Sequence, residues 1–435
     1  MKITILTYGS SGDVLPFIAL AKGLNASGNE VSLCAPINFA GTIKSADLTY
    51  FPLRSNLQQI FQTTDGSKWM NAKSTYKFNN ALANICFAER LTLQHDTLEA
   101  CKNADAIIAG SLMVYYAAMI SEKLQLPMLT ANVNPVLALT GDFPHFVVRP
   151  RPYFLGLLNK ATYILMAAAY EKYMKPVVNP WRVEIGLPEL KGSVFLKMLE
   201  LKTPIVLGYS PALLPKSQAW EDHVVVTGEW KADDDHFSPE QIEVELQNWL
   251  KAGPAPIYFG FGSMPVPDPA TLISLIKEIC AETHSRAILV SGWTNIEIPE
   301  SDLGSAIYYA KYANLQWLFP QCSSVVIHGG VGTTHICLAA GIPPVICSLF
   351  SDNAFWGERL QKLKIGRHIP YNKLTKKRLL KALSLLKKDE PRTLAREYGQ
   401  KIKAETGVQN AVDFINKYLP VALPYNDWKG KKRKE

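Results

Sequence analysis

The clearest structural signal in this chain is the stretch "SSVVIHGGVGTTHICLAAGI", residues 323–342. A short β-branched run, a glycine turn and a run of helical character predict strand, turn and helix in succession. The first N–H groups of a helix have no intrahelical partner, and the helix dipole is positive at that end. The turn is therefore a candidate binding site for an anion such as a diphosphate.

Side chains around this glycine turn could complete the anion site. His328 ends the predicted strand, while Thr333 and Thr334 stand in the first helical turn and offer hydroxyl donors. The stretch matches neither the Walker A loop nor the GxGxxG dinucleotide fingerprint. A tight turn with a satisfied histidine is the alternative interpretation. For His335, which falls on the helix, a structural role is expected.

Strands and helices alternate along most of the chain, from "KITIL" onward and again from about residue 205. This rhythm predicts parallel sheets that helices cover on both faces. Because 435 residues exceed one ordinary core, we predict an α/β protein with two doubly wound, Rossmann-like domains facing across a cleft. Ligands of such sheets bind at the carboxyl ends of the strands, so the site is expected between the domains.

The predicted domains are residues 1–215 and residues 216–402. A helix at about 403–419 is expected to pack back on the first domain, and residues 420–435 form a basic tail. Within the first domain, residues 141–190 interrupt the rhythm. They are predicted to hold a helix at 154–174 between proline-rich loops, where a lid or a ligand-binding wall could lie.

The net charge of +8 is concentrated in residues 373–388 and in the C-terminal "KGKKRKE". A solvated face is one interpretation, and weak association with an anionic membrane surface is the other. No basic groove with interleaved aromatics is visible, so no nucleic-acid partner is expected. Seven scattered cysteines without a CxxC pair argue against a zinc site. Without a signal peptide or a membrane-spanning run, the protein is predicted to be cytoplasmic, or peripheral to a membrane.

Other strand ends carry residues that suit a nucleotide. Ser263, in "FGFGSM", can bond a phosphate, unless this is a plain turn. Trp293, in "SGWTN", is placed to stack on a planar base, with a core position as the alternative. The loop that holds Tyr312, Ala313 and Trp317 can cover a base edge through backbone bonds.

Three further polar residues are candidates for substrate binding or catalysis. Asp352 and Asn353 follow an apolar strand and could bond vicinal sugar hydroxyls, although such a pair also caps helices. Asp13, in "YGSSGDVLPF", lies in the loop after the first strand. It is the candidate general base, and a helix cap is the alternative.

Together these stretches resemble the UDP-sugar-dependent glycosyltransferases with the GT-B fold, in the branch of sterol and glycopeptide-antibiotic glucosyltransferases. Residues 7–24 are similar to that branch's "GSRGDVxP" opening, with Ser11 where arginine is usual. Residues 317–360 match its donor-binding signature. The resemblance implies an inverting, metal-independent transfer of a hexose, with glucose as first choice. It requires no cofactor, because the UDP-sugar is a co-substrate.

The resemblance also implies roles for single residues. The C-terminal domain would hold the UDP-sugar and the N-terminal domain the acceptor. Asp13 and His328 would be catalytic, and no metal ligand is implied. Donor contacts would come from Ser263, Trp293, Ala313, His328, Gly330, Gly332, Thr333, Thr334, Asp352 and Asn353. Acceptor contacts are expected from Ser11, Gly12, Phe143 and Phe146. The family often has glutamine where Asn353 stands, which leaves the identity of the sugar open.

The apolar and aromatic residues around 69–90 and 133–175 suggest a lipophilic acceptor such as a sterol, triterpenoid or polyphenol, although a packed core has the same composition. Two other functions remain open. A GT-B-fold nucleotide-sugar isomerase or epimerase is disfavoured by this lipophilic half. A catalytically inactive nucleotide-sugar-binding protein is disfavoured by the presence of Asp13.

Overall fold

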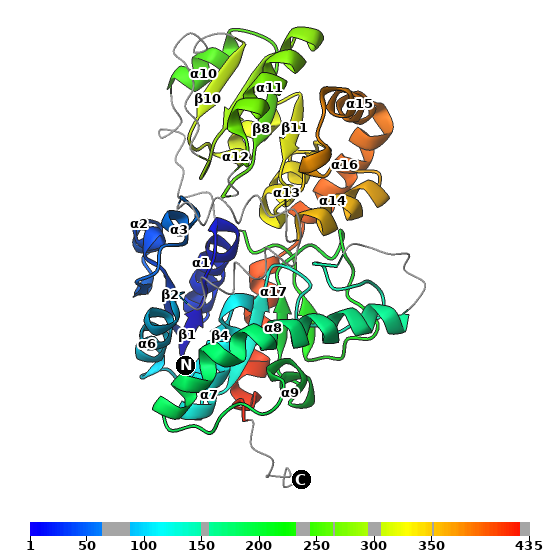
Figure 1. Cartoon of the computed structure of the whole chain (residues 1–435). Coiled ribbons are helices and arrows are strands. Elements are labelled where there is room, and N and C mark those ends of the chain that lie inside the picture. Colours follow the sequence, from blue (N-terminus) through cyan, green and yellow to red (C-terminus); the bar gives the residue numbers. More distant parts are fainter. Residues whose placement is uncertain are drawn as a thin grey trace.

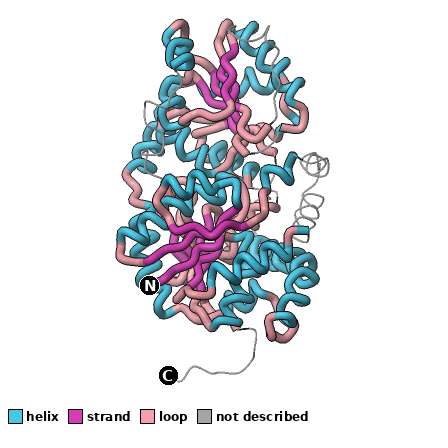
Figure 2. Tube along the Cα trace, turned by 90° about the vertical axis from the view of Figure 1, so that its left-hand side faces the viewer, coloured by secondary structure: helices cyan, strands magenta, loops and turns pink. Residues whose placement is uncertain are grey.

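The computed structural model describes residues 1–62, 88–148, 156–231, 244–263, 266–294, 306–349 and 352–426. Two parallel sheets form the centres of two domains, and helices cover both sheets (Figure 1). Figure 2 shows the strands of the two sheets as separate groups, one above the other. The predicted α/β fold with two doubly wound domains is confirmed.

The first sheet has seven strands in the order β3-β2-β1-β4-β5-β6-β7. The inner strands β4 and β5 are short runs such as "AIIA" that are buried along their whole length, as expected for a parallel sheet covered on both faces. In chain order the elements are β1 Lys2–Leu6, α1 Ser11–Ala26, β2 Glu30–Pro36, α2 Ala40–Ser45, β3 Thr49–Leu53, α3 Leu57–Gln62, α6 Arg90–Cys101, β4 Ala106–Ala109, α7 Val114–Leu124, β5 Met128–Asn132, α8 Gly156–Glu184, α9 Val194–Glu200, β6 Ile205–Leu207 and β7 Val224–Val226.

The second sheet has six strands in the order β10-β9-β8-β11-β12-β13. Its central strands, β8 and β11, are fully buried. The elements are α10 Val244–Lys251, β8 Ile257–Gly260, α11 Pro269–Thr283, β9 Ala287–Val290, β10 Ile307–Ala310, α12 Leu315–Leu318, β11 Ser324–Ile327, α13 Val331–Ala339, β12 Val345–Ile346, α14 Asn353–Lys362, β13 Arg367–His368, α15 Lys376–Leu386, α16 Asp389–Lys403 and α17 Gly407–Tyr418.

The first sheet extends beyond residue 215, the predicted end of the first domain. Strand β7 pairs in parallel with β6, with Ile205 opposite Val224, so the sheet continues to Val226. The chain later returns to this domain, because α17 packs against α1. Gly23 of α1 makes this approach possible, since a Cβ there would lie 2.5 Å from the Val408 side chain.

Helix α8 is longer than the predicted helix at 154–174, because it runs from Gly156 to Glu184 and includes Pro176 and Pro180. Proline removes a helical hydrogen bond, and tertiary packing compensates here. Trp181 is only 4% exposed, and the Arg182 guanidinium donates to a Glu122 carboxylate oxygen at 2.8 Å. Among the described helices, none is both long and apolar enough to cross a membrane.

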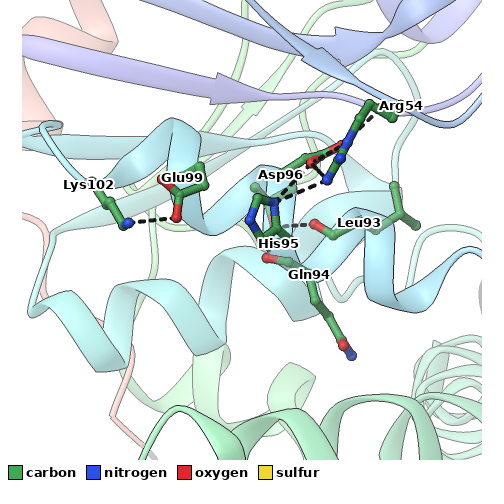
Figure 3. A network of polar contacts seen from close by, with 8 residues as sticks. Arg54, Leu93, Gln94, His95, Asp96, Glu99 and Lys102 are labelled. Atoms are coloured by element: carbon green, nitrogen blue, oxygen red, sulfur yellow. Dashed lines mark hydrogen bonds and ion pairs between the residues drawn. The ribbon is translucent and has the colours of Figure 1, made fainter.

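A polar network joins the end of β3 to α6, the helix next to it in Figure 3. The Asp96 carboxylate accepts hydrogen bonds from the Arg54 backbone N–H at 2.9 Å and from its guanidinium at 2.7 Å. Burial opposes ionisation of Asp96, but the bonds from Arg54 outweigh it and hold the pKa of this carboxyl below its usual value. The network is a structural anchor at the edge of the first sheet.

Candidate active site

The candidate site lies at the point in each sheet where the order of successive strands reverses. In the first sheet the reversal falls between β1 and β4, and in the second between β8 and β11. Doubly wound sheets bind ligands at such points, outside the carboxyl ends of the strands. Ser11 follows β1 and Ser263 follows β8. The Ser263 hydroxyl donates to the Ser11 hydroxyl at 3.0 Å, so the two reversal points meet across the domain interface.

Closely packed glycines build the donor side of this junction. Gly262 has a φ of +59° and Gly292 a φ of +58°. A Cβ on Gly292 would lie 2.0 Å from the Gly262 carbonyl oxygen, which also accepts the Trp293 N–H at 3.1 Å. Because no side chain fits between them, the turns after β8 and β9 are in direct backbone contact. Together they form one wall of the candidate site.

His328 occupies the end of β11 beside this wall. It is 8% exposed, and a Cβ on Gly262 would lie 3.0 Å from its Cε1 atom. Burial lowers the pKa of His328 to about 4, although the nearby Gly260 backbone opposes the shift. The imidazole is therefore neutral at pH 7, and its Nδ1 is buried without a hydrogen-bond partner among the described residues. Such an atom costs about 1–3 kcal/mol, which a phosphate oxygen of a ligand could relieve.

Helix α13 begins at Val331, three residues after His328, with Gly330 at its N-cap. A Cβ on Gly330 would lie 2.5 Å from His328 Nε2, whereas one on Gly332 would meet no atom within 4 Å. The start of the helix is therefore open at Gly332 and closed by the imidazole at Gly330. Thr333 is partly exposed there, while Thr334 is fully buried and its hydroxyl has no hydrogen-bond partner.

His335, one residue further, has the structural surroundings that its sequence position suggested. It is fully buried, and its Nε2 accepts the Ser210 backbone N–H at 3.1 Å. Burial lowers its pKa to about 3, so the ring is neutral. This bond ties α13 to the segment after β6, in the other domain.

Asp13 lies in the first turn of α1, which begins at Ser11, rather than in a loop as predicted from the sequence. Its Oδ2 accepts the Ser10 N–H at 2.8 Å and the Ser10 hydroxyl at 3.1 Å, so Asp13 does take part in a helix cap. Neither bond involves Oδ1, and the side chain is partly exposed. Burial raises the pKa of Asp13 more strongly than the Ser10 bonds lower it. A carboxylate with a raised pKa is a better base.

Gly9 controls the position of this carboxylate. It has a φ of +140°, and a Cβ there would lie 2.3 Å from Asp13 Oδ2. We expect Gly9→Ala to displace Asp13 and to lower kcat by about a hundredfold, because small misplacements of reacting groups are costly. The affinity for UDP, which the other domain is predicted to bind, should stay unchanged in calorimetry.

The matched control for Gly9→Ala is Gly41→Ala. Gly41 is an exposed glycine of α2 in the same domain, and a Cβ there would meet no atom within 4 Å. Equal losses of turnover in both variants would mean that Gly9 acts through general stability and not through Asp13.

The residues predicted to bind the nucleobase differ in their solvent exposure. Trp293 is 6% exposed and belongs to the core, so little of its ring is open for stacking. The loop after β10 offers more surface, because Ala313 and Trp317 are partly exposed and Tyr312 is 57% exposed. This loop starts α12, where the Asn314 side chain caps the helix by accepting the Trp317 N–H at 3.1 Å.

Asp352 and Asn353 stand at the start of α14, next to the turn after β11. Asp352 holds the N-cap position, but its side chain makes no capping hydrogen bond. Asn353 is 3% exposed, and its Oδ1 is buried without a partner. A Cβ on Gly329 would lie 3.1 Å from the Asn353 carbonyl oxygen. The predicted sugar and diphosphate positions therefore adjoin.

The predicted acceptor residues fall into two places. Ser11 and Gly12 form the first turn of α1 beside Asp13, and Gly12 is exposed. Phe143 is buried at the domain interface, with its ring 5.7 Å from that of Phe355 in α14. Phe146 is partly buried and stacks on His145 at 4.7 Å.

Sequence reasoning missed a polar contact that crosses the interface near these rings. The Trp356 indole N–H donates to Asn134 Oδ1 at 2.8 Å. The partners are 222 residues apart, so no local pattern marked them. Among the described residues, no group of three or more His, Cys, Asp and Glu side chains could hold a metal ion.

Two protein-family models match the chain. The N-terminal domain of glycosyltransferase family 28 matches residues 3–140. The C-terminal domain of the erythromycin biosynthesis protein CIII-like family matches residues 297–413. The first match includes the turn that carries Asp13, and the second includes α13 and the start of α14.

Curated relatives align with almost the whole chain. UDP-sugar-dependent glycosyltransferase 52 of Dictyostelium discoideum is 30% identical over 97% of the chain. A sterol 3-beta-glucosyltransferase of Debaryomyces hansenii is 31% identical over 95% of it. The chain spans 26% of the length of each of these two relatives. A sterol 3-beta-glucosyltransferase of Arabidopsis thaliana is 28% identical over 100% of the chain, which spans 71% of that relative.

Solved structures show the same two-domain fold. The glycosyltransferase of kitacinnamycin has a TM-score of 0.71 at 15% identity, over 96% of this chain and 99% of its own. The glycosyltransferase VinC, solved with dTDP, has a TM-score of 0.64 at 15% identity, over 97% of this chain and 100% of its own. At this identity the likeness concerns the fold.

Proposed function

The chain belongs to the glycosyltransferases of the GT-B fold, and on this premise we propose that it transfers a hexose from a UDP-sugar to a hydroxyl of a lipophilic small molecule. Glucose is the first candidate sugar. The observation that carries the proposal is the 3.0 Å contact between Ser11 and Ser263. It brings the turn of Asp13, on one domain, next to the glycine turns and the α13 N-terminus of the other.

We assign to Asp13 the role of the general base that activates the acceptor hydroxyl. An acceptor hydroxyl is a weak nucleophile at neutral pH, so a base must take its proton as the new bond forms. The acceptor oxygen attacks the anomeric carbon, and its proton passes to Asp13. The bond from that carbon to the diphosphate oxygen breaks, and the electron pair leaves with UDP. A single displacement of this kind inverts the configuration at the anomeric carbon.

The donor side must stabilise negative charge that grows on the departing diphosphate. The N–H groups at the start of α13 lie at the positive end of the helix dipole. Gly332 leaves this end open, and His328 lies beside it with an unsatisfied Nδ1. Preorganised donors of this kind are worth about 3 kcal/mol each in the transition state. These protein groups support the proposal of a metal-independent reaction without a cofactor.

The acceptor class rests on two kinds of support. Several relatives are named as sterol 3-beta-glucosyltransferases. Next to the domain interface, the His145 ring stacks on Phe146 and meets the Tyr163 ring edge-on, which gives a small aromatic group. Burial lowers the pKa of His145 to about 4, which keeps its ring neutral. Residues 69–87 of the other apolar stretch lie outside the described residues. We propose a sterol or a similar aglycone, handled by a cytoplasmic protein with weak peripheral attachment to membranes.

The test is incubation with UDP-glucose, with and without a sterol, a triterpenoid and a polyphenol, in the presence of a metal chelator. We expect UDP release that depends on the acceptor, together with a product heavier by one hexose in mass spectrometry. A changed sugar without acceptor would identify an isomerase instead. UDP-sugar binding without any turnover would identify a binding protein.

A further inference from the structure

Helix α8 carries apolar side chains on the face that points away from its domain. In Figure 1 it runs across the N-terminal domain. Its inner face buries Asn159, Tyr163 and Met174, which contact the rest of the domain. Its outer face carries Leu157, Leu158, Ile164 and Leu165, which are 84%, 60%, 47% and 68% exposed, followed by the exposed Ala168 and Ala169. We call these six residues the α8 apolar face.

This arrangement is unusual for a surface helix of a globular protein. Such a helix normally turns one apolar stripe inward and polar side chains outward. In α8 the outward stripe repeats at helical spacing, from Leu157 through Leu165 to Ala169, for more than three turns. Single exposed apolar residues are ordinary, but a contiguous apolar face marks an interaction site.

The charges around the α8 apolar face indicate its partner. Lys160, two residues after Leu158, and Lys172, three residues after Ala169, are exposed, and Lys175 follows one turn later. The acidic residues of α8 are Glu171, which is buried, and Glu184, which ends the helix. A helix with an apolar face, exposed lysines beside it and no exposed acid between them fits the interface of an anionic bilayer.

The start of α8 is also joined to the domain interface. The Asn159 side chain donates to the Gly141 carbonyl at 2.8 Å, and the Thr162 hydroxyl accepts the His145 N–H at 2.8 Å. The same loop holds Phe143, whose ring is 5.7 Å from that of Phe355 in the other domain. A molecule taken from a bilayer at α8 would therefore meet the aromatic group of His145, Phe146 and Tyr163 next to the domain interface.

We propose that the α8 apolar face docks on anionic lipid bilayers, so that a lipophilic acceptor can enter from the membrane. The entry route rests on the proposed transferase function, whereas the docking itself does not. A second copy of the chain is the competing occupant. It would present no anionic surface to Lys160 and Lys172, because a two-fold contact would bring the same lysines together.

The test is flotation of the full chain with vesicles of phosphatidylglycerol and phosphatidylcholine. The wild-type chain should float with them and bind less at high salt. Leu157→Asp with Leu165→Asp should lower the partition coefficient about tenfold or more. Leu91→Asp is the matched control, because Leu91 is a single leucine of α6 with 65% exposure in the same domain. It should bind like the wild type.

Folding of the double variant is checked through UDP affinity and the thermal midpoint. If it does not fold, Lys160→Glu with Lys172→Glu should reduce binding to anionic vesicles instead. Unchanged flotation of these variants, or no flotation of the wild type, would overturn the proposal. So would a wild-type dimer that the aspartates convert to a monomer. Because flotation needs no turnover, failure of docking and failure of the transferase assay are separate results.

Discussion

Asp13→Asn is expected to lower kcat by about a hundredfold to ten-thousandfold, the usual contribution of a general base. The asparagine oxygen can still accept the Ser10 N–H, which Asp13 Oδ2 accepts at 2.8 Å, so the start of α1 should remain intact. UDP affinity should not change, since the predicted nucleotide contacts lie on the other domain. Steady-state kinetics with the best acceptor and calorimetry with UDP measure the two quantities.

Stability and pH dependence separate the catalytic role of Asp13 from its capping role. Burial raises its pKa, so the folded protein loses stability as the pH rises from the ordinary aspartate pKa through the raised one. Asp13→Asn should therefore keep or slightly raise the thermal midpoint at pH 7.

The raised pKa of Asp13 should also move the acidic limb of the wild-type rate profile to higher pH. Ser10→Ala, which removes one of the two capping bonds, should have little effect on kcat. A loss equal to that of Asp13→Asn would assign both residues to capping.

His328→Ala is expected to reduce kcat by about a hundredfold to a thousandfold and UDP affinity by about tenfold or more. The physical reason is the position of the neutral ring against Gly262 and Gly330, with a buried Nδ1 that has no partner in the free protein. His328→Gln, which keeps an N–H donor, should recover part of the loss. His284→Asn, at the exposed end of α11, is the control.

Protonation gives a second readout for His328. Burial holds its pKa at about 4, and a nearby diphosphate should raise it. UDP binding at about pH 6 should therefore take up a proton, which calorimetry in buffers of different ionisation enthalpy detects. His328→Gln should abolish this uptake. If wild type and variant bind UDP with equal affinity and equal proton uptake, the diphosphate does not contact His328.

Local patterns in the chain were sufficient for its fold class and for much of the candidate site. Strand β11, the glycine turn and α13 were predicted because apolar β-branched runs, positive-φ glycines and helix starts are encoded within about ten neighbouring residues. The fold and the resemblance to the glycosyltransferase family were predicted from such strand–turn–helix units. The same reasoning placed His328 at the end of β11, beside Gly330 and the first turn of α13.

Features that depend on contacts distant in sequence required the tertiary structure. Strand β7 joins the first sheet because it pairs with β6, and α8 continues through Pro176 and Pro180 because its inner face is packed. Trp293 is an example in the binding region, since it is buried and its backbone N–H donates to Gly262 in the turn after β8, 31 residues earlier.

The clearest feature of this kind is the contact between the two points at which the strand order reverses. Ser11 and Ser263 are 252 residues apart, and their contact depends on the relative placement of two sheets that have no local signal in common. Local hydrogen bonding and periodicity therefore specify the strand–turn–helix units. Packing across the domain interface decides which turns face each other, because only there do side chains from both domains compete for the same space.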